Sequence, residues 1–335
     1  MRLLVTGGAG YIGSHTCVVL MQAGYEVVIL DSLVNSRRDV VARIGRIIGR
    51  EPAFVEGDVR DRALVRRLLS DEGVDGVIHF AGLKAVGESV DQPLVYYDCN
   101  VYGTIALCEA MAEVGVKMLV FSSSATVYGD PQAVPIREDF PCSATNPYGR
   151  SKLIVEDILA DLFRADPAWC IARLRYFNPV GAHESGMIGE APNGVPNNLV
   201  PYVADVAAGR RERLAVFGDD YPTRDGTGVR DYIHVMDLAE GHVAALNALV
   251  AQNGMVTVNL GTGRGYTVLE MVRAFAEASG KEVPYVLSPR RPGDVAECYA
   301  DPTLAATLFN WRARRNIDAM CRDTWRWEQW RQHNL

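Results

Sequence analysis

The sequence predicts an α/β fold: a doubly wound parallel sheet over residues 1–177, followed by a smaller α/β domain over residues 178–335. Three observations support this prediction. Short apolar runs alternate with longer helical patterns up to about residue 177. A glycine-rich turn directly follows the first apolar run. Beyond residue 177, clusters of Gly, Pro and Asn interrupt the alternation.

The elements of the first half can be placed in order. Strands are expected at residues 2–6, 26–30, 53–56, 74–80, 117–123 and 170–176. Helices are expected between them at 14–23, 37–48, 61–69, 101–114 and 147–164. The strands are nearly continuous apolar runs, as is typical of strands that helices cover on both faces. Strands that alternate with helices in this way form a parallel sheet.

The first turn has the spacing of a dinucleotide-binding site. Gly7, Gly10 and Gly13 lie between the first strand and the first helix, one residue longer than the usual Gly-x-Gly-x-x-Gly. Gly7 would make the tight turn, Gly10 would let a pyrophosphate reach the helix N-terminus, and Gly13 would allow close packing. This predicts a Rossmann-type cofactor domain.

Asp31 ends the second strand, 18 residues after Gly13. A carboxylate at this place binds the ribose diol of NAD and repels the 2′-phosphate of NADP, so NAD is the expected cofactor. The alternative is that Asp31 is only a turn residue at a strand end.

Tyr148 and Lys152 are four residues apart at the start of a predicted helix, so both side chains project from one face. An ammonium group beside a phenol favours the phenolate, and the pair is therefore expected to lower the pKa of Tyr148. Such a tyrosine can take a proton from an alcohol. The alternative is an unremarkable surface pair.

Composition limits the partners. The formal net charge is −7 and no basic stripe interleaved with aromatics occurs, which argues against nucleic acid. No apolar run approaches the roughly 20 residues that span a bilayer, and no signal-peptide pattern is present, so a cytoplasmic protein without a membrane partner is expected. Seven cysteines without Cys-x-x-Cys fit a reducing compartment, and the histidines show no metal-ligand spacing.

The second half is expected to cover the cleft and to hold the substrate. It carries loops at 181–201 and 218–228 and two arginine-bearing segments at 228–232 and 289–294. Elements such as residues 232–245 are expected to return to the first domain. A final helix bears Trp325, Trp327 and Trp330, which we assign to packing or to an oligomer contact.

Several motifs together resemble the extended short-chain dehydrogenase/reductase family, and within it the nucleotide-sugar epimerases. They are the glycine turn at 6–13, Ser124 ahead of Val127-Tyr128-Gly129, and the Tyr148–Lys152 pair. The match continues through blocks 79–89, 175–182 and 228–238. It implies reversible C4 epimerisation of UDP-glucose and UDP-galactose through a 4-keto sugar with bound NAD. Tyr148 would take the 4-hydroxyl proton, Ser124 would hydrogen-bond that oxygen, and Lys152 would hold the nicotinamide ribose.

The resemblance also implies two sets of binding residues. Those for NAD are Gly7, Gly10, Tyr11, Ile12, Gly13, Asp31, Asn35, Ser36, Asp58, Val59, Phe80, Ala81, Gly82, Lys84, Asn100, Ser122, Tyr148, Lys152, Tyr176 and Phe177. Those for the UDP-sugar are Lys84, Ser124, Tyr148, Phe177, Asn178, Asn198, Leu199, Val216, Phe217, Arg230, Tyr232, Arg291, Asp294 and Cys298. A homodimer through helices near residues 90–114 and 148–164 is implied as well.

Neighbouring activities in the family stay open to test. Related 4,6-dehydratases carry an Asp-Glu pair just after the catalytic hydroxyl residue, where this chain has Ala125 and Thr126. Neither exchanges a proton near neutral pH, which argues against dehydration. A dehydrogenase or reductase with net consumption of NAD, and a non-catalytic NAD sensor, are the other two hypotheses.

Two positions depart from the family pattern. Cys99 stands where some relatives have an Asn that contacts the cofactor, and Asn100 is adjacent. Cys298 stands where some relatives have a Tyr against the sugar, and a smaller residue there suggests that N-acetylated UDP-sugars are accepted too. If Tyr299 faces the sugar instead, this expectation reverses.

Overall fold

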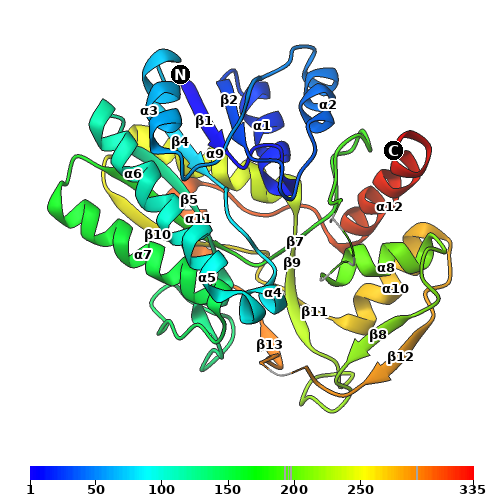
Figure 1. Cartoon of the computed structure of the whole chain (residues 1–335). Coiled ribbons are helices and arrows are strands. Elements are labelled where there is room, and N and C mark those ends of the chain that lie inside the picture. Colours follow the sequence, from blue (N-terminus) through cyan, green and yellow to red (C-terminus); the bar gives the residue numbers. More distant parts are fainter. Residues whose placement is uncertain (192–193, 195, 197, 292) are drawn as a thin grey trace.

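The computed structural model describes residues 1–191, 194, 196, 198–291 and 293–335. At its centre lies a seven-stranded sheet in the order β10-β6-β5-β4-β1-β2-β3, in which every neighbouring pair is parallel (Figure 1). The strands are β1 (Arg2–Thr6), β2 (Glu26–Asp31), β3 (Ala53–Glu56), β4 (Gly76–His79), β5 (Met118–Ser124), β6 (Cys170–Tyr176) and β10 (Met255–Leu260).

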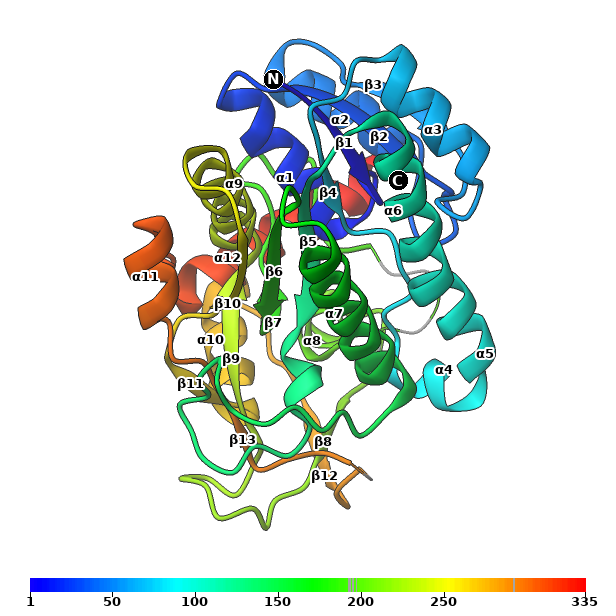
Figure 2. The same ribbon diagram turned by 90° about the vertical axis from the view of Figure 1, so that its left-hand side faces the viewer.

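Helices cover both faces of this sheet, as the apolar strands require. Alternate residues of a strand face opposite sides, so Leu3 and Val5 enter one core and Leu4 enters the other. The first core holds α1 (Tyr11–Gln22), α2 (Asp39–Ile48), α9 (Val235–Ala251) and α11 (Thr303–Phe309). The second core holds α3 (Arg62–Asp71), α6 (Gly103–Val114) and α7 (Pro147–Ala165), which Figure 2 shows along one side of the molecule.

The predicted fold class is confirmed, and the six predicted strands are present in place. The prediction missed some elements. β10 joins the sheet beside β6 although it lies far along the chain. Two short helices, α4 (Val86–Asp91) and α5 (Pro93–Tyr96), and a π-helical turn at Tyr97–Tyr102 precede α6. A 3₁₀ turn at Ala125–Tyr128 follows β5.

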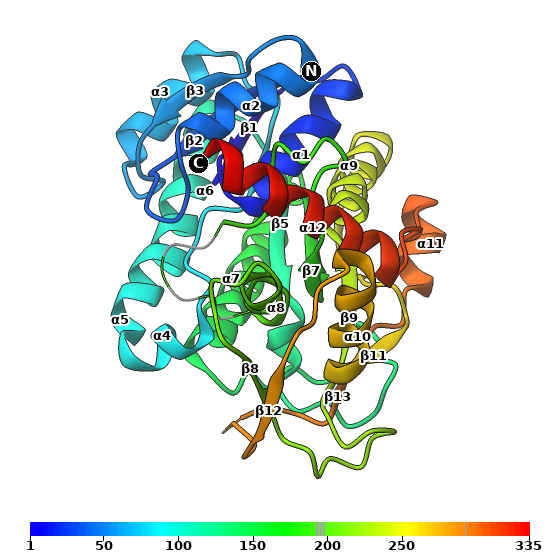
Figure 3. The same cartoon turned by 90° about the vertical axis from the view of Figure 1, so that its right-hand side faces the viewer.

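The second half forms its own smaller core. One sheet contains β7 (Asn178–Val180), β9 (Val229–His234), β11 (Gly265–Thr267) and β13 (Glu297–Cys298), and β8 (Leu214–Phe217) pairs with β12 (Tyr285–Ser288). Helices α8 (Leu199–Ala207), α10 (Val268–Ser279) and α12 (Ile317–Asn334) pack against them. Figure 3 shows α12 running from this half toward α2. Among the described residues, no helix combines the length and apolar character needed to cross a membrane.

The sheet order places the site. Strand order reverses between β1 and β4, and ligands of such sheets bind beyond the carboxyl ends of the strands at this reversal. The second half lies against that edge, because β7 continues from the end of β6 and α9 returns to the first core directly after β9.

Candidate active site

In the glycine turn, the backbone after β1 lies close to the start of α1 and to the loop after β4. Gly7 has a φ of +70°, and a Cβ there would lie 2.7 Å from the backbone N of Ala81. A Cβ on Gly13 would lie 2.2 Å from the carbonyl oxygen of Gly7. Gly10 caps α1 without a side chain, so the first N–H groups of the helix stay open to a ligand. This cradle suits a pyrophosphate at the positive end of the helix.

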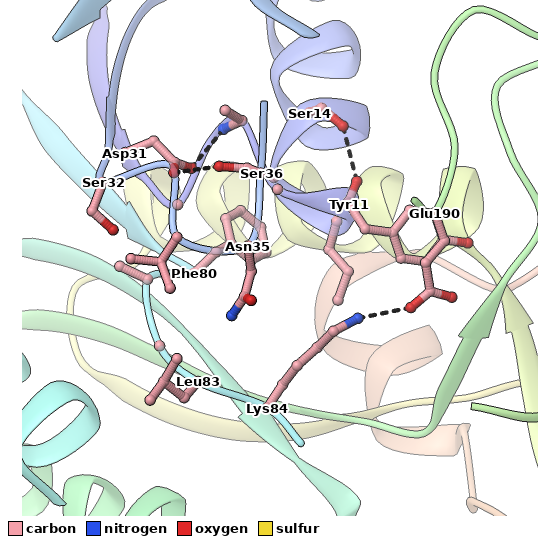
Figure 4. A pocket seen from close by; sticks show the side chains of 18 of the residues that line it. Tyr11, Ser14, Asp31, Ser32, Asn35, Ser36, Phe80, Leu83, Lys84 and Glu190 are labelled. Carbon is pink, nitrogen blue, oxygen red and sulfur yellow. Dashed lines mark hydrogen bonds and ion pairs between the residues drawn. The ribbon is translucent and has the colours of Figure 1, made fainter. Parts of the chain in front are cut away.

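Beside the turn lies a cavity of about 600 Å³ (Figure 4). Its walls come from the ends of β1, β2, β3, β4 and β6 and from α7 and α2, the arrangement expected at the carboxyl edge of a parallel sheet. Most of the expected NAD residues line it: Gly7, Gly10, Tyr11, Ile12, Gly13, Asp31, Asn35, Ser36, Asp58, Val59, Phe80, Ala81, Gly82, Lys84, Tyr148, Lys152 and Tyr176.

Asp31 lines the cavity and also forms hydrogen bonds with the glycine turn. One oxygen accepts a hydrogen bond from the Ser36 hydroxyl at 2.6 Å, and the other accepts from the backbone N of Ala9 at 3.0 Å (Figure 4). These hydrogen bonds agree with the interpretation of Asp31 as a turn residue, and its expected contact with a ribose stays a prediction. Its carboxylate joins the glycine turn to the loop after β2 and faces the cavity.

Tyr148, Lys152 and Ser124 meet at one end of the cavity. Asn146 caps α7 by accepting from the N–H of Gly149 at 2.9 Å, which places Tyr148 in the first turn of the helix. The Tyr148 hydroxyl is hydrogen-bonded to Ser124. The Lys152 ammonium donates to the carbonyl oxygen of Ser122 at 2.8 Å, and burial lowers its pKa to about 8.

The expected lowering of the Tyr148 pKa is wrong for this arrangement. Burial raises the pKa of Tyr148 well above its ordinary value, and the neighbouring Tyr176 raises it further. The hydrogen bond from Ser124 opposes this effect. Lys152 does not stabilise the phenolate because its ammonium is drawn to the Ser122 carbonyl and to the ring face of Phe121, 4.9 Å away.

Ser124 is also a turn cap. Its Oγ accepts from the backbone N of Thr126 at 3.2 Å and from the Thr126 hydroxyl at 2.9 Å. Because the serine oxygen accepts twice, its own proton is available for the Tyr148 oxygen. The capping interpretation and the catalytic one describe the same geometry.

Three residues expected to touch NAD lie behind the cavity wall instead. Asn100 accepts from the N–H of Leu83 at 2.8 Å and donates to the carbonyl oxygen of Leu83 at 3.0 Å, so its amide holds the loop after β4. Cys99, its neighbour, does line the cavity. Ser122 positions Lys152, and Phe177 packs in a hydrophobic cluster. None of these three residues lines the cavity, and their expected contact with NAD stays a prediction.

The cavity also contains residues that sequence reasoning missed. Glu190 accepts a hydrogen bond from Lys84 Nζ at 2.8 Å (Figure 4). It also accepts one from Asn198 Nδ2 at 3.1 Å. Trp327 and Arg43 line the opposite wall. No local pattern marks these residues: Glu190 sits in a stretch interpreted only as a loop, and the tryptophans were assigned to packing.

Four of the expected UDP residues, Asn178, Arg230, Tyr232 and Cys298, lie on the small sheet. Asn178 of β7 is the register partner of Tyr232, and Cys298 of β13 is the register partner of Arg230. Arg291 Nε donates to Asp294 at 3.0 Å, and the Arg230 guanidinium lies 4.0 Å from Asp294. The Arg291 guanidinium also lies 4.9 Å from the ring centre of Phe217.

Some members of that set face the core. Val216 and Tyr232 are buried in the core of the second half, and Leu199 packs against it. Burial raises the pKa of Tyr232 to about 12, while Arg230 acts in the opposite direction. The Val216 side chain packs in this core, and the expected contacts of Val216 and Tyr232 with the sugar nucleotide stay predictions.

The ambiguity between Cys298 and Tyr299 is resolved by packing. Cys298 packs against the cluster that contains Phe177 and Ala125, next to Ser124. The ring of Tyr299 lies on the other side, 3.1 Å from where a Cβ on Gly265 would be. Cys298 therefore faces the catalytic side of the sheet.

Comparison with known proteins places this geometry in context. A family profile described as GDP-mannose 4,6 dehydratase matches residues 4–324. The chain is 60% identical to a UDP-glucose 4-epimerase of Bacillus subtilis, with 98% of this chain and 97% of the relative covered. It is 56% identical to a UDP-glucose 4-epimerase of Mus musculus, with 98% and 96% covered.

Solved structures agree with these relatives. A UDP-glucose-4-epimerase from Stenotrophomonas maltophila, solved with bound NAD and formylated UDP-arabinopyranose, superposes with a TM-score of 0.99 at 54% identity and full coverage of both chains. A UDP-glucose 4-epimerase from Bifidobacterium longum, solved with NAD+ and UDP, gives a TM-score of 0.96 at 50% identity, again with both chains fully covered.

Proposed function

The chain belongs to the UDP-glucose 4-epimerase family, and on that premise we propose that it interconverts UDP-glucose and UDP-galactose by reversible oxidation at C4 with one bound NAD. One observation carries the proposal. The Tyr148 hydroxyl, hydrogen-bonded to Ser124, lines the same cavity as the glycine turn that can receive a dinucleotide.

The residues present suit the cofactor. Gly7, Gly10 and Gly13 leave the room that a pyrophosphate needs at the start of α1, and Asp31 faces the same cavity. Lys152, on the Tyr148 side, can donate to a ribose hydroxyl. Bound NAD would supply a hydride acceptor for C4 and the positive charge of its oxidised ring.

The chain's own groups handle the proton. Tyr148 accepts the proton of the sugar 4-hydroxyl, while Ser124 donates to the oxygen that becomes the ketone. Because the Lys152 ammonium is held by the Ser122 carbonyl, negative charge that forms on Tyr148 would be stabilised mainly by the positively charged ring of bound NAD. Once the 4-keto sugar has rotated, hydride would return to the opposite face of C4 and Tyr148 would return the proton to the C4 oxygen, which gives the stereoisomer.

Epimerisation requires that the nucleotide stay fixed while the 4-keto hexose rotates. Arg230, Arg291 and Asp294 form a charged group that can hold the UDP portion, since arginine binds phosphate through planar paired donors. Phe177 and Cys298 provide an apolar surface without hydrogen-bond demands near the sugar. Charged contacts that hold UDP and an apolar surface around the hexose together allow that rotation.

Dehydration, the activity named by the family profile, is disfavoured by the same site. Ala125 is buried and has no polar side chain. The Thr126 hydroxyl is committed to Ser124. Neither group can act as the acid or base that elimination of a C6 hydroxyl needs.

Incubation of purified protein with UDP-glucose and no added cofactor tests the proposal. UDP-galactose should form, because the enzyme regenerates its own NAD. Deuterium placed at C4 of UDP-glucose should reappear at C4 of UDP-galactose. Loss of that deuterium to water, or a stoichiometric requirement for NAD, would instead support a different reaction.

A second activity, the epimerisation of UDP-N-acetylglucosamine and UDP-N-acetylgalactosamine, is favoured by one observation. Cys298 is a small residue that packs on Phe177 at the catalytic side. A tyrosine in its place would overpack the pocket, which costs about 1–3 kcal/mol in a filled site. Cys298→Tyr should lower turnover of the N-acetylated sugars and spare UDP-glucose. Equal turnover of the N-acetylated sugars in the variant contradicts this.

We also propose that the protein forms a homodimer and lies in the cytoplasm. Val90, Leu94, Val95 and Tyr102 expose apolar side chains on α4, α5 and the adjoining π-helical turn. Such a patch supports a homodimer through this side of the molecule.

All seven cysteines are unpaired, as expected in the reducing cytoplasm, where we place the protein.

A further inference from the structure

The C-terminal helix reaches back across the molecule to the cofactor domain. Figure 3 shows α12 leaving the second half and ending beside α2. Contact between them is made by Arg43 of α2, whose guanidinium carbon lies 5.4 Å from the ring centres of both Trp327 and Trp330. The two indole rings are stacked, with centres 5.6 Å apart and planes inclined by 16°.

Arg43 is an unusual cation. It is only 4% exposed, and its Nε and Nη1 atoms have no hydrogen-bond acceptor among the described residues. Within the part of the chain that the structure describes, it forms one ion pair, from Nη2 to Asp39 at 3.3 Å. The indole faces are what compensates the buried charge, because a guanidinium over tryptophan is attracted by the negative ring face.

This contact forms part of the cavity wall. Arg43 and Trp327 both line the cavity, as does the loop after β4. Trp327 is fixed from two sides: its Nε1 donates to the carbonyl oxygen of Glu190 at 3.0 Å, and Gly189 packs so closely that a Cβ there would lie 2.4 Å from the indole. Glu190 then reaches Lys84 across the cavity. A continuous set of contacts therefore runs from α2 through α12 to the far wall.

We propose that Arg43, Trp327 and Trp330 form a cation–π clasp that holds α12 against α2 and slows the release of the bound dinucleotide. The proposal rests on the proposed function in that NAD is taken to occupy this cavity. On this proposal, NAD leaves past the part of the cavity wall that Arg43 and Trp327 form, and its exit separates the guanidinium from the indoles. The clasp explains physically how an enzyme that recycles its NAD retains it between turnovers.

Dissociation of labelled NAD tests the clasp. Protein loaded with radiolabelled NAD is chased with excess unlabelled NAD, and the label that remains bound is followed over time. Arg43→Met keeps the length of the side chain but removes the cation, and should accelerate release about tenfold. Arg43→Lys keeps a cation over the rings and should stay closer to the parent. Arg46→Met, an exposed position one turn along α2, is the matched control and should match the parent.

Trp330→Leu provides a second, independent variant. It should accelerate release alone, and adding it to Arg43→Met should give little further effect, because both changes break one contact.

Release from Arg43→Met at the rate of Arg46→Met would overturn the proposal. If Arg43→Met fails to fold, release from Trp330→Leu at the parent rate overturns it instead. A parent chain that binds labelled NAD but lacks epimerase activity would contradict the proposed reaction and leave the clasp measurement valid. A parent chain that binds no NAD would contradict both.

Discussion

At the scale of single residues, the decisive feature is the burial of Tyr148. Its hydroxyl is set in an apolar surrounding that opposes ionisation, and Ser124 offers the one hydrogen bond that favours it. The proton-accepting state therefore depends on charges that arrive with the ligands. A resting site with a neutral phenol is protected from unproductive chemistry in water.

Replacement of this hydroxyl tests its role. Tyr148→Phe should lower kcat by about 10²–10⁴-fold, the range for loss of a general base, because the proton then has no positioned acceptor. The NAD content of the purified variant should stay equal to that of the parent. Tyr285→Phe, at an exposed tyrosine on β12, is the control. Full activity of Tyr148→Phe would refute the assigned role.

Lys152 gives a pH dependence with a definite sign. Burial lowers its pKa from 10.5 to about 8, so above pH 8 the folded chain has lost a proton that the unfolded chain still binds. Stability from this group therefore rises between pH 8 and about 10, by about 1–2 kcal/mol from pH 8 to 9.5. Urea unfolding of the cofactor-free protein should show this rise, and Lys152→Met should remove it. The same slope in the variant would assign the effect to other groups.

The sequence predicts the position of the glycine turn well because its signal is local. Gly7, Gly10 and Gly13 have a fixed spacing, and the backbone contacts that exclude a side chain there are made within one strand-turn-helix unit. Arg43, Trp327 and Glu190 could not be found this way. Their relation exists only after distant elements have packed, and each residue alone resembles a surface charge, a core aromatic or a loop residue.

At the scale of elements, the position of α7 determines the geometry of the catalytic pair. Glu156, one turn after Lys152, forms a buried ion pair with Arg175 of β6 at 2.6 Å. The Ser123 hydroxyl also donates to Glu156, at 2.5 Å. These contacts fix the register of α7 against β5 and β6, and so the distance between Ser124 and Tyr148.

Removing this pair should be costly. Glu156→Ala leaves Arg175 charged and without its carboxylate inside the protein, so the free energy of unfolding should fall by about 3–5 kcal/mol in chemical denaturation. Asp157→Ala, at the exposed neighbouring position, should change it by less than about 0.5 kcal/mol. Similar values for the two variants would show that the buried pair does not hold α7.

The sequence predicts the six strands of the first half but not β10, and the reason is physical. The six strands of the first half are apolar on both faces, and this pattern needs no knowledge of the partner strand. In β10, the run Met255-Val256-Thr257-Val258-Asn259-Leu260 includes polar residues, and Asn259 is used to hold the hydroxyl of Tyr128 at 2.7 Å. Its sequence does not reveal which sheet it joins.

At the scale of the whole molecule, one side remains apolar and exposed. Leu94 is 79% exposed and Val90 is 61% exposed, both on the short helices beside α7 (Figure 2). Since Val95 lines the cavity as well, the proposed dimer contact lies close to the site. Assembly and catalysis are therefore expected to be linked through α5.

A charge placed in this patch should separate the subunits. Leu94→Glu should shift the sedimentation coefficient from that of a dimer to that of a monomer, because a carboxylate would have to be buried at the contact. Leu308→Glu, at an exposed leucine on α11, should leave the assembly unchanged. A parent chain that sediments as a monomer would rule out the dimer.

The placement of β10 beside β6 has a consequence for how such a chain can evolve. The sheet that carries the cofactor turn is completed by residues 255–260, and α9 and α11 from the same stretch cover one of its faces. Exchange of the sugar-binding part between relatives by a single crossover near residue 178 would split that sheet between two parents. A recombinant keeps the pairing of β10 with β6 only if both strands, together with α9 and α11, come from one parent. The two halves of the chain are therefore expected to be inherited together.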